Sequence, residues 1–210
     1  VAIDDLTFSA KKDNITSIIG PNGAGKTTVF NCLTGFYKAT AGSMYLNKDD
    51  NKMDLKKFSD FKVAQKAGVA RTFQNIRLFP QMSVLENMMV AQHNKLMKAS
   101  GFSILGLINS KSYLQQEKEA MEISKYWLDI IGLTNRADDN AGDLPYGDQR
   151  KLEIVRAMCI EPHLLCLDEP AAGLNAKESA ELNKLLKFIK NDKKTGILLI
   201  EHDMSVVMGI

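Results

Sequence analysis

Residues 20–27 read Gly-Pro-Asn-Gly-Ala-Gly-Lys-Thr and match the phosphate-binding pattern G-x-x-x-x-G-K-[ST] at every fixed position. Glycines let backbone N–H groups curl around phosphate oxygens without side-chain clashes, and a following helix directs its positive N-terminal end at the same anion. A lysine adds a point charge on the outer phosphates, and a threonine hydroxyl can bind Mg²⁺. The pattern therefore predicts a nucleotide-binding loop made by Gly20, Pro21, Asn22, Gly23, Ala24, Gly25, Lys26, Thr27 and Thr28.

This phosphate loop (residues 20–28) is shared by kinases, GTPases and many ATPases, so it does not by itself determine the reaction. A literal N-K-x-D match, which could indicate a GTPase, occurs at residues 47–50. It comes soon after the loop, before any second phosphate-sensing segment, which argues against that function. We interpret it as a solvated turn at the end of a strand.

Two carboxylates, Asp168 and Glu169, directly follow the apolar run at residues 164–167. Charges at the tip of a buried strand need partners, and Mg²⁺ is a natural partner for them. We expect Asp168 to hold the metal mostly through water and Glu169 to polarise an attacking water. A single carboxylate could be an ordinary acidic strand end, but this pair downstream of a phosphate loop indicates hydrolysis.

Gln74 and His202 also follow predicted strands, at residues 69–73 and 197–200. The carboxyl ends of parallel strands meet at one edge of a sheet, so both side chains are expected near Asp168. We therefore predict a catalytic set of Gln74, Glu169 and His202, and a Mg²⁺ set of Thr27, Gln74 and Asp168.

Strand and helix patterns alternate along the chain, which predicts an α/β fold with a mostly parallel core sheet. Strands are expected at residues 1–8, 15–19, 43–46, 69–73, 164–167 and 197–200. Helices are expected at residues 27–34, 84–91, 114–131, 149–160 and 177–190. Ser83 and Glu86 form a capping box for the second helix. Residues 49–66 are expected to be helix or loop, and residues 94–112 to be the least regular part.

Composition excludes several classes of protein. The 210 residues are 45% hydrophobic and 25% charged, the ordinary balance of a globular protein rather than a disordered or collagen-like one. The net charge of +2 gives no basic surplus for nucleic acid. No stretch approaches the ~18 consecutive apolar residues of a membrane-spanning helix. The three cysteines lie far apart, which favours reduced thiols over a zinc site.

Six motifs occur in the order found in the ATP-binding subunits of ABC transporters, and on them the chain resembles that family. They are the phosphate loop, Gln74, residues 144–150 (LPYGDQR), residues 168–170 (DEP), residues 172–175 (AGLN) and His202. The resemblance covers essentially the whole chain. It implies a P-loop ATPase fold in which an N-terminal antiparallel β part and a helical lobe accompany the parallel sheet. It further implies a single domain, residues 1–210, cut at both ends, with the lobe at about residues 84–160.

Residues 71–79 (RTFQNIRLF), 82–87 (MSVLEN) and 168–175 (DEPAAGLN) resemble the branched-chain amino acid uptake ATPases in particular. This implies an ATP-hydrolysing subunit that powers an importer of branched-chain or related amino acids. Urea or amide uptake ATPases and lipopolysaccharide-export ATPases are near neighbours. A non-transport ABC ATPase acting on DNA or ribosomes and a regulatory nucleotide-binding module without hydrolysis are further alternatives.

The family also implies a head-to-tail dimer that traps two ATP–Mg²⁺ between its subunits. The phosphate loop of one subunit then faces the signature segment of the other, here Leu144, Pro145, Tyr146, Gly147 and Asp148. The dimer loop would be Ala172, Gly173, Leu174 and Asn175. Implied partners are a second ABC ATPase subunit, paralogous or identical, membrane permease subunits and, indirectly, a solute-binding protein, but no nucleic acid.

The same resemblance implies a position at the cytoplasmic face of the plasma membrane, held there through the permease. A groove near Gln74 receives a helix of the permease in this family. Ile76, Leu78, Phe79 and Met82 are expected either to line that groove or to fill the core.

The signature departs from the usual Leu-Ser-Gly-Gly-Gln. Pro145 stands where serine is usual, which removes one hydrogen bond to the γ-phosphate, typically ~1.5–3 kcal/mol. Tyr146 replaces a glycine, and Asp148 replaces glutamine and is expected to point away from the phosphate. Asn175 stands where the family has aspartate. The resemblance implies that the family's adenine-stacking aromatic precedes the first residue, and Phe8 is expected in the core.

Overall fold

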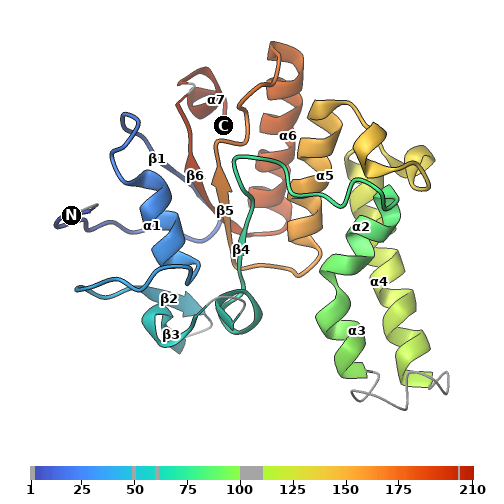
Figure 1. Ribbon diagram of the computed structural model, residues 1–210, viewed down its shortest axis with the longest axis horizontal. Helices are drawn as coiled ribbons and strands as arrows, with labels where there is room; N and C mark the ends of the chain where they lie inside the picture. The colour runs from blue at the N-terminus through green and yellow to red at the C-terminus, as the bar shows by residue number, and fades with distance from the viewer. Residues whose placement is uncertain (1–2, 49–50, 60–61, 100–110, 203) are drawn as a thin grey trace. The chain divides into compact units, whose positions relative to one another are not determined.

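The computed structural model describes residues 3–48, 51–59, 62–99, 111–202 and 204–210 (Figure 1). Contacts divide the chain into two compact units. Unit 1 comprises Val1–Asn75 and Glu161–Ile210, and it contains both β-sheets. Unit 2 comprises Ile76–Ile160, and its regular elements within the described residues are helices.

A four-stranded parallel sheet lies at the centre of unit 1, in the order β1-β6-β5-β4. The strands are β1 (Ile15–Ile18), β4 (Val69–Arg71), β5 (Leu164–Asp168) and β6 (Gly196–Ile200). Strands β5 and β6 are buried along their whole length, as their apolar runs predict for parallel strands covered on both faces. Ile200 pairs with Ile18 on one side and with Asp168 on the other. The carboxyl ends of β1, β5 and β6 therefore meet at one edge, and the predicted parallel core sheet is confirmed.

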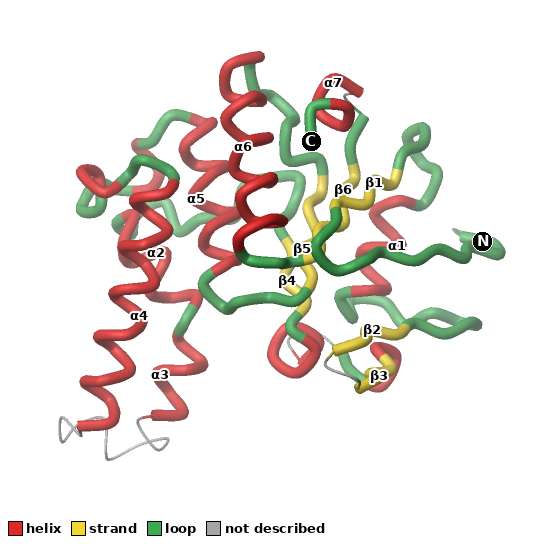
Figure 2. Tube along the Cα trace, turned by 180° about the vertical axis from the view of Figure 1, so that it is seen from behind, coloured by secondary structure: helices red, strands yellow, loops and turns green. Residues whose placement is uncertain are grey.

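Helices α1 (Lys26–Leu33), α6 (Ala176–Asp192) and α7 (Met204–Met208) belong to the same unit. In both views α1 and α6 lie on opposite sides of the sheet (Figures 1 and 2). Helix α6 turns its apolar stripe inward by burying Leu182, Leu185, Leu186 and Ile189. One buried hydrophobic cluster consists of Phe30, Leu55, Val63, Ala67, Val69, Leu164, Cys166, Leu198 and Ile200.

A second, antiparallel pair joins β2 (Tyr45–Lys48) and β3 (Asn51–Asp54), which confirms the expected antiparallel β part. Strand β3 falls in a stretch expected to be helix or loop, and that expectation is wrong there. The N-K-x-D match begins within β2, and its last two residues lie outside the described part. The expected strand near the N-terminus is absent from residues 3–14, where Leu6 and Phe8 are 52% and 42% exposed. The prediction that Phe8 lies in the core is therefore wrong. Alternating apolar side chains favour a strand, but a strand forms only where another strand pairs with it.

Unit 2 is built from α2 (Val84–Ala91), α3 (His93–Ala99), α4 (Lys111–Ile130) and α5 (Tyr146–Met158). Helix α2 has the predicted bounds, and its capping box forms: the Glu86 N–H donates to Ser83 Oγ, and the Ser83 N–H donates to the Glu86 carboxylate. Helix α3 occupies part of the stretch expected to be irregular, and residues 100–110 of that stretch lie outside the described part. Helix α5 begins three residues before the predicted Gln149.

Short helical turns complete the described elements. They span Leu55–Lys57, Val63–Ala67, Thr134–Arg136 and Ala141–Asp143. The three cysteines are free thiols: Cys159 and Cys166 are buried, and Cys32 is half-buried. Among the described residues, no helix combines the length and apolar character needed to cross a membrane.

Candidate functional site

The phosphate loop links the end of β1 to the start of α1 at the edge where β1, β5 and β6 meet. Gly23 and Gly25 have φ angles of 82° and 83°, a left-handed backbone that favours glycine. Gly25 is the N-cap of α1 and has no side chain to bind the first-turn N–H groups of that helix. Those groups carry the partial positive charge that favours a bound anion. The local backbone thus has the form that the motif predicts.

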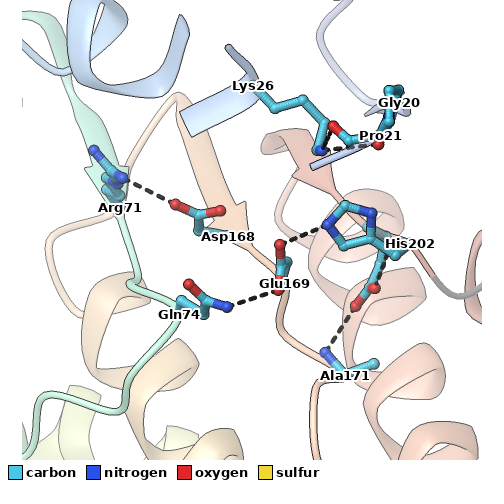
Figure 3. A network of polar contacts seen from close by, with 10 residues as sticks. Gly20, Pro21, Lys26, Arg71, Gln74, Asp168, Glu169, Ala171 and His202 are labelled. Atoms are coloured by element: carbon cyan, nitrogen blue, oxygen red, sulfur yellow. Dashed lines mark hydrogen bonds and ion pairs between the residues drawn. The ribbon is translucent and has the colours of Figure 1, made fainter. Parts of the chain in front are cut away.

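Lys26 is buried, and Figure 3 shows its side chain directed at Gly20 and Pro21 of its own loop. Its Nζ donates hydrogen bonds to the carbonyl oxygens of Gly20 and Pro21, each at 2.8 Å. These carbonyls hold the ammonium group at the loop. Phosphate oxygens bound there would compete with the carbonyls as acceptors of its hydrogen bonds. Thr27 is exposed, and Thr28 is half-buried.

Glu169 lies between the two other predicted catalytic residues (Figure 3). The Gln74 amide donates from Nε2 to Glu169 Oε2 at 2.9 Å. His202 Nε2 lies 2.7 Å from Glu169 Oε1. The Glu169 N–H donates to the Ile200 carbonyl at 2.9 Å, so strand pairing sets the position of the carboxylate. The structure therefore brings together all three residues that the sequence predicts as catalytic.

The backbone of Glu169 is unusual, because its φ of 49° lies in the left-handed region. Non-glycine residues adopt this region at some energetic cost, and such residues concentrate at functional sites. With both oxygens engaged, the carboxylate has a defined orientation. A carboxylate held in this way can accept a proton from an attacking water molecule.

Asp168 ends β5 and is paired with Arg71, which ends β4. Arg71 Nη2 lies 3.0 Å from Asp168 Oδ2, and both side chains are buried. Burial raises the pKa of Asp168, and the hydrogen bond and charge of Arg71 limit that rise. In the sequence alone, Arg71 stands out only as part of a family motif. One feature of the sequence does point to Arg71: a buried carboxylate such as Asp168 needs a positively charged partner, and a neighbouring strand can supply it.

The oxygen atoms of Thr27, Gln74 and Asp168 are of the kind that Mg²⁺ prefers. Gln74 engages Glu169 through its amide nitrogen, so its oxygen is the atom that could serve a metal. Nowhere in the described residues do three or more His, Cys, Asp or Glu side chains gather as a metal-binding group. A set with one carboxylate suits a cation that takes its remaining ligands from phosphate and water. The residues present thus fit a nucleotide-bound Mg²⁺.

Glu201 is a residue that sequence reasoning missed. It is buried, and its Oε1 accepts from the Ala171 N–H while its Oε2 accepts from the His202 N–H, both at 2.9 Å. It therefore ties the loop after β5 to the segment that carries His202. The sequence pattern that indicates Glu201 is the one that indicates Asp168, namely a carboxylate directly after an apolar run that forms a buried strand.

The predicted dimer loop turns tightly after β5. The Ala172 N–H donates to the Glu169 carbonyl, and Gly173 has a φ of 79°. Asn175 ends the loop as the N-cap of α6, where its Oδ1 accepts from the N–H groups of Lys177 and Glu178. The asparagine found in place of the family's aspartate thus has a local structural role.

The signature segment (residues 144–148) lies at the start of α5 in unit 2. Leu144 and Gly147 are buried, whereas Pro145 and Tyr146 are exposed. The Asp148 carboxylate pairs with Lys151 on its own helix, Oδ1 to Nζ at 2.9 Å. This pair reduces the repulsion that a free carboxylate would exert on a phosphate.

A buried ion pair, also missed from the sequence, lies behind the signature segment. Arg150 Nη1 is 2.8 Å from Glu153 Oε2, and both side chains are almost completely buried. Arg150 Nη2 also donates to the Tyr146 hydroxyl at 3.2 Å. Glu153 Oε1 accepts from the Arg77 N–H at 2.9 Å. Burial raises the pKa of Glu153, and the Arg77 N–H together with the charges of Arg150 and Arg156 limits that rise.

The four apolar residues after Gln74 differ in their exposure. Ile76, Leu78 and Met82 are half-buried, whereas Phe79 is 47% exposed. The Asn87 side chain binds both the N–H and the carbonyl of Phe79, at 2.9 and 3.0 Å. The exposed ring is thus held on a well-anchored backbone.

Comparison with known proteins gives consistent results. A family model described as "ABC transporter" matches residues 3–172. The chain is 49% identical over 210 residues to the high-affinity branched-chain amino acid transport ATP-binding protein LivG of Escherichia coli K12. The corresponding protein BraF of Pseudomonas aeruginosa is 45% identical. Both alignments cover 100% of this chain and 79% of the relative.

A solved structure gives the same result at the level of the fold. The crystal structure of a nucleotide-free ATP-binding cassette from an ABC transporter matches with a TM-score of 0.77. The match covers 99% of this chain and 78% of that chain, at 31% sequence identity.

Proposed function

Since this chain belongs to the ABC transporter family of ATP-binding proteins, we propose that it powers a membrane importer of branched-chain or related amino acids. Members of the family hydrolyse ATP, and the chain is an ATPase of this kind. The proposed substrate is supported by relatives that are described as branched-chain amino acid transport proteins. The observation that carries the proposed chemistry is Glu169, held between Gln74 and His202 beside a phosphate loop.

The residues of unit 1 have distinct roles in this proposal. The phosphate loop and Lys26 bind the phosphates of ATP. Glu169 accepts a proton from the attacking water, while Gln74 and His202 hold its carboxylate in place. Thr27, Gln74 and Asp168 would hold Mg²⁺, which neutralises charge on the phosphates. Hydrolysis then depends on positioning and electrostatics more than on covalent chemistry.

The proposal includes a second ATPase subunit. Two such domains pair head to tail, and the signature segment of each completes the phosphate site of the other. Residues 172–175 lie in the dimer contact, and unit 2 serves as the helical lobe of a single ATPase domain. Partners at the membrane are permease subunits, and a solute-binding protein acts through them. The chain then works at the cytoplasmic face of the membrane.

The substrate is tested by isolating the membrane complex with its binding protein. ATP hydrolysis is measured in vesicles with leucine, with urea and without solute, and Glu169→Gln supplies the background rate. Leucine or a related amino acid is expected to stimulate hydrolysis. Stimulation by urea alone, or copurification with ribosomes and no membrane subunit, would contradict the proposed function.

A further inference from the structure

We infer that Arg71 is a positioning residue for ATP hydrolysis, because it fixes the Asp168 carboxylate relative to the helix that begins at the phosphate loop. The inference rests on the proposed function, in which Asp168 and Thr27 hold the cation bound to ATP. Arg71 itself reaches neither the predicted catalytic cluster nor the loop through any contact described above. Its effect on the reaction would pass through Asp168.

The guanidinium of Arg71 binds two elements at once. Its Nη2 pairs with Asp168 Oδ2 on β5 at 3.0 Å. Its Nη1 donates to Asn31 Oδ1 at 2.5 Å and lies 3.5 Å from Thr34 Oγ1. Asn31 lies in the last turn of α1, and Thr34 is the C-cap of that helix. The planar fork of the guanidinium carries its donors on separate nitrogens and can reach both elements at once, whereas the three donors of an ammonium group share one nitrogen.

Three aromatic rings further restrict the guanidinium. The Arg71 Cζ lies 4.9 Å from the ring centroid of Phe73, 5.7 Å from that of Phe30 and 5.9 Å from that of Phe36. The rings of Phe36 and Phe73 also contact each other edge to face, with centroids 6.1 Å apart. The side chain of Arg71 is 6% exposed. Such packing leaves the guanidinium little room to reorient.

The geometry has a direct consequence for the proposed metal ligands. Helix α1 begins at Lys26 and Thr27 and ends beside Arg71. Arg71 therefore links the helix that carries Thr27 to the carboxylate of Asp168. Only Oδ2 of Asp168 is paired with Arg71, and the other carboxylate oxygen points away from the guanidinium in Figure 3. That oxygen can serve a hydrated cation while the first one keeps the carboxylate from turning.

The test uses Arg71→Lys, which keeps the positive charge and removes the fork. In the variant we expect kcat to fall about tenfold with an almost unchanged KM for ATP, the effect typical of outer-shell positioning groups. Binding of Mn²⁺, measured by electron paramagnetic resonance in ATP-loaded Glu169→Gln protein, should weaken by a similar factor. Binding of ATP without metal should stay the same. Asn31→Leu leaves the Arg71–Asp168 pair in place. It should lower kcat and weaken Mn²⁺ binding by smaller factors than Arg71→Lys does.

The matched control is Arg136→Lys, the same substitution in an exposed ion pair with Asp139. It should change neither readout. The inference is overturned if folded Arg71→Lys and Asn31→Leu proteins bind Mn²⁺ and hydrolyse ATP as the parent does. It is also overturned if ATP binding without metal weakens as much as Mn²⁺ binding does. If the parent protein itself neither binds nor hydrolyses ATP, the proposed function fails, independently of Arg71.

Discussion

Glu169 is the residue on which the proposed hydrolysis depends. Both of its oxygens are engaged by side chains from other segments, and its own N–H is bound to β6. Its position is therefore set by several independent contacts rather than by a flexible side chain. A group held in this way needs little reorganisation during the reaction. Such preorganised groups are usually the largest contribution to stabilising the transition state.

Glu169→Gln should retain ATP binding and lose at least about 100-fold in turnover, since the amide cannot take the proton of water. Phosphate release and nucleotide binding measure the two effects separately. Glu117→Gln, an exposed site on α4, serves as the matched control. An unchanged rate of phosphate release in Glu169→Gln would show that another group is the base.

Glu153 gives a prediction about stability. Burial raises its pKa above the ordinary value of 4.5, so the folded state holds the proton more tightly than the unfolded state does. Its contribution to stability is full below pH 4.5 and is lost as the pH rises through the raised pKa. The free energy of unfolding of the parent should therefore fall with pH over this range relative to Glu153→Gln. Urea unfolding at several pH values measures the difference, and parallel curves for the two proteins would contradict the prediction.

At the scale of the elements, local hydrogen bonds decide where several helices begin. Both α2 and α6 start with a capping box, in which a side chain binds backbone N–H groups that the helix leaves free. Such boxes can be read from neighbouring residues alone. For this reason the start of α2 was predictable.

Asn175→Ala should lower the free energy of unfolding by about 1 kcal/mol, because two N–H groups of α6 lose their acceptor. The free energy of unfolding of Asn175→Asp should equal that of the parent or exceed it by about 0.3–1 kcal/mol, since a negative charge is favoured at a helix N-terminus. Urea unfolding of both variants provides the measurement. An alanine variant as stable as the parent would show that the cap contributes nothing.

Other elements could not be predicted from their own residues. Strand β3 is polar and short, and it exists because β2 pairs with it. Near the N-terminus the apolar residues alternate as in a strand, yet residues 3–14 form no strand. In both places pairing with a distant segment decides the structure, and side-chain periodicity carries no information about the partner.

At the scale of the whole molecule, the residues assigned to the proposed reaction come from both units, which differ in secondary structure. The phosphate loop, Gln74, Glu169 and His202 belong to unit 1, and the signature segment belongs to unit 2. In the proposed dimer the signature segment contacts ATP bound to the other subunit. The two groups of residues should therefore respond differently to nucleotide.

Hydrogen exchange can separate these responses. ATP with Mg²⁺ should protect residues 20–34 of the monomer, because the nucleotide binds the loop directly. Residues 144–148 should gain protection only when Glu169→Gln traps the dimer. The control is the same protein with ATP at a dilution at which it stays monomeric. Equal protection of residues 144–148 in monomer and dimer would contradict the head-to-tail arrangement.

The sequence alone was sufficient to predict the phosphate loop, the parallel sheet and the residues at its carboxyl edge. These features depend on consecutive residues: glycines at a fixed spacing, apolar runs, and the polar groups that follow them. The partners of buried charges were decided only by the tertiary structure. Arg71 meets Asp168, and Glu201 meets Ala171, across long separations in sequence. A buried charge requires a partner, but which residue provides it depends on the strands that the fold places side by side.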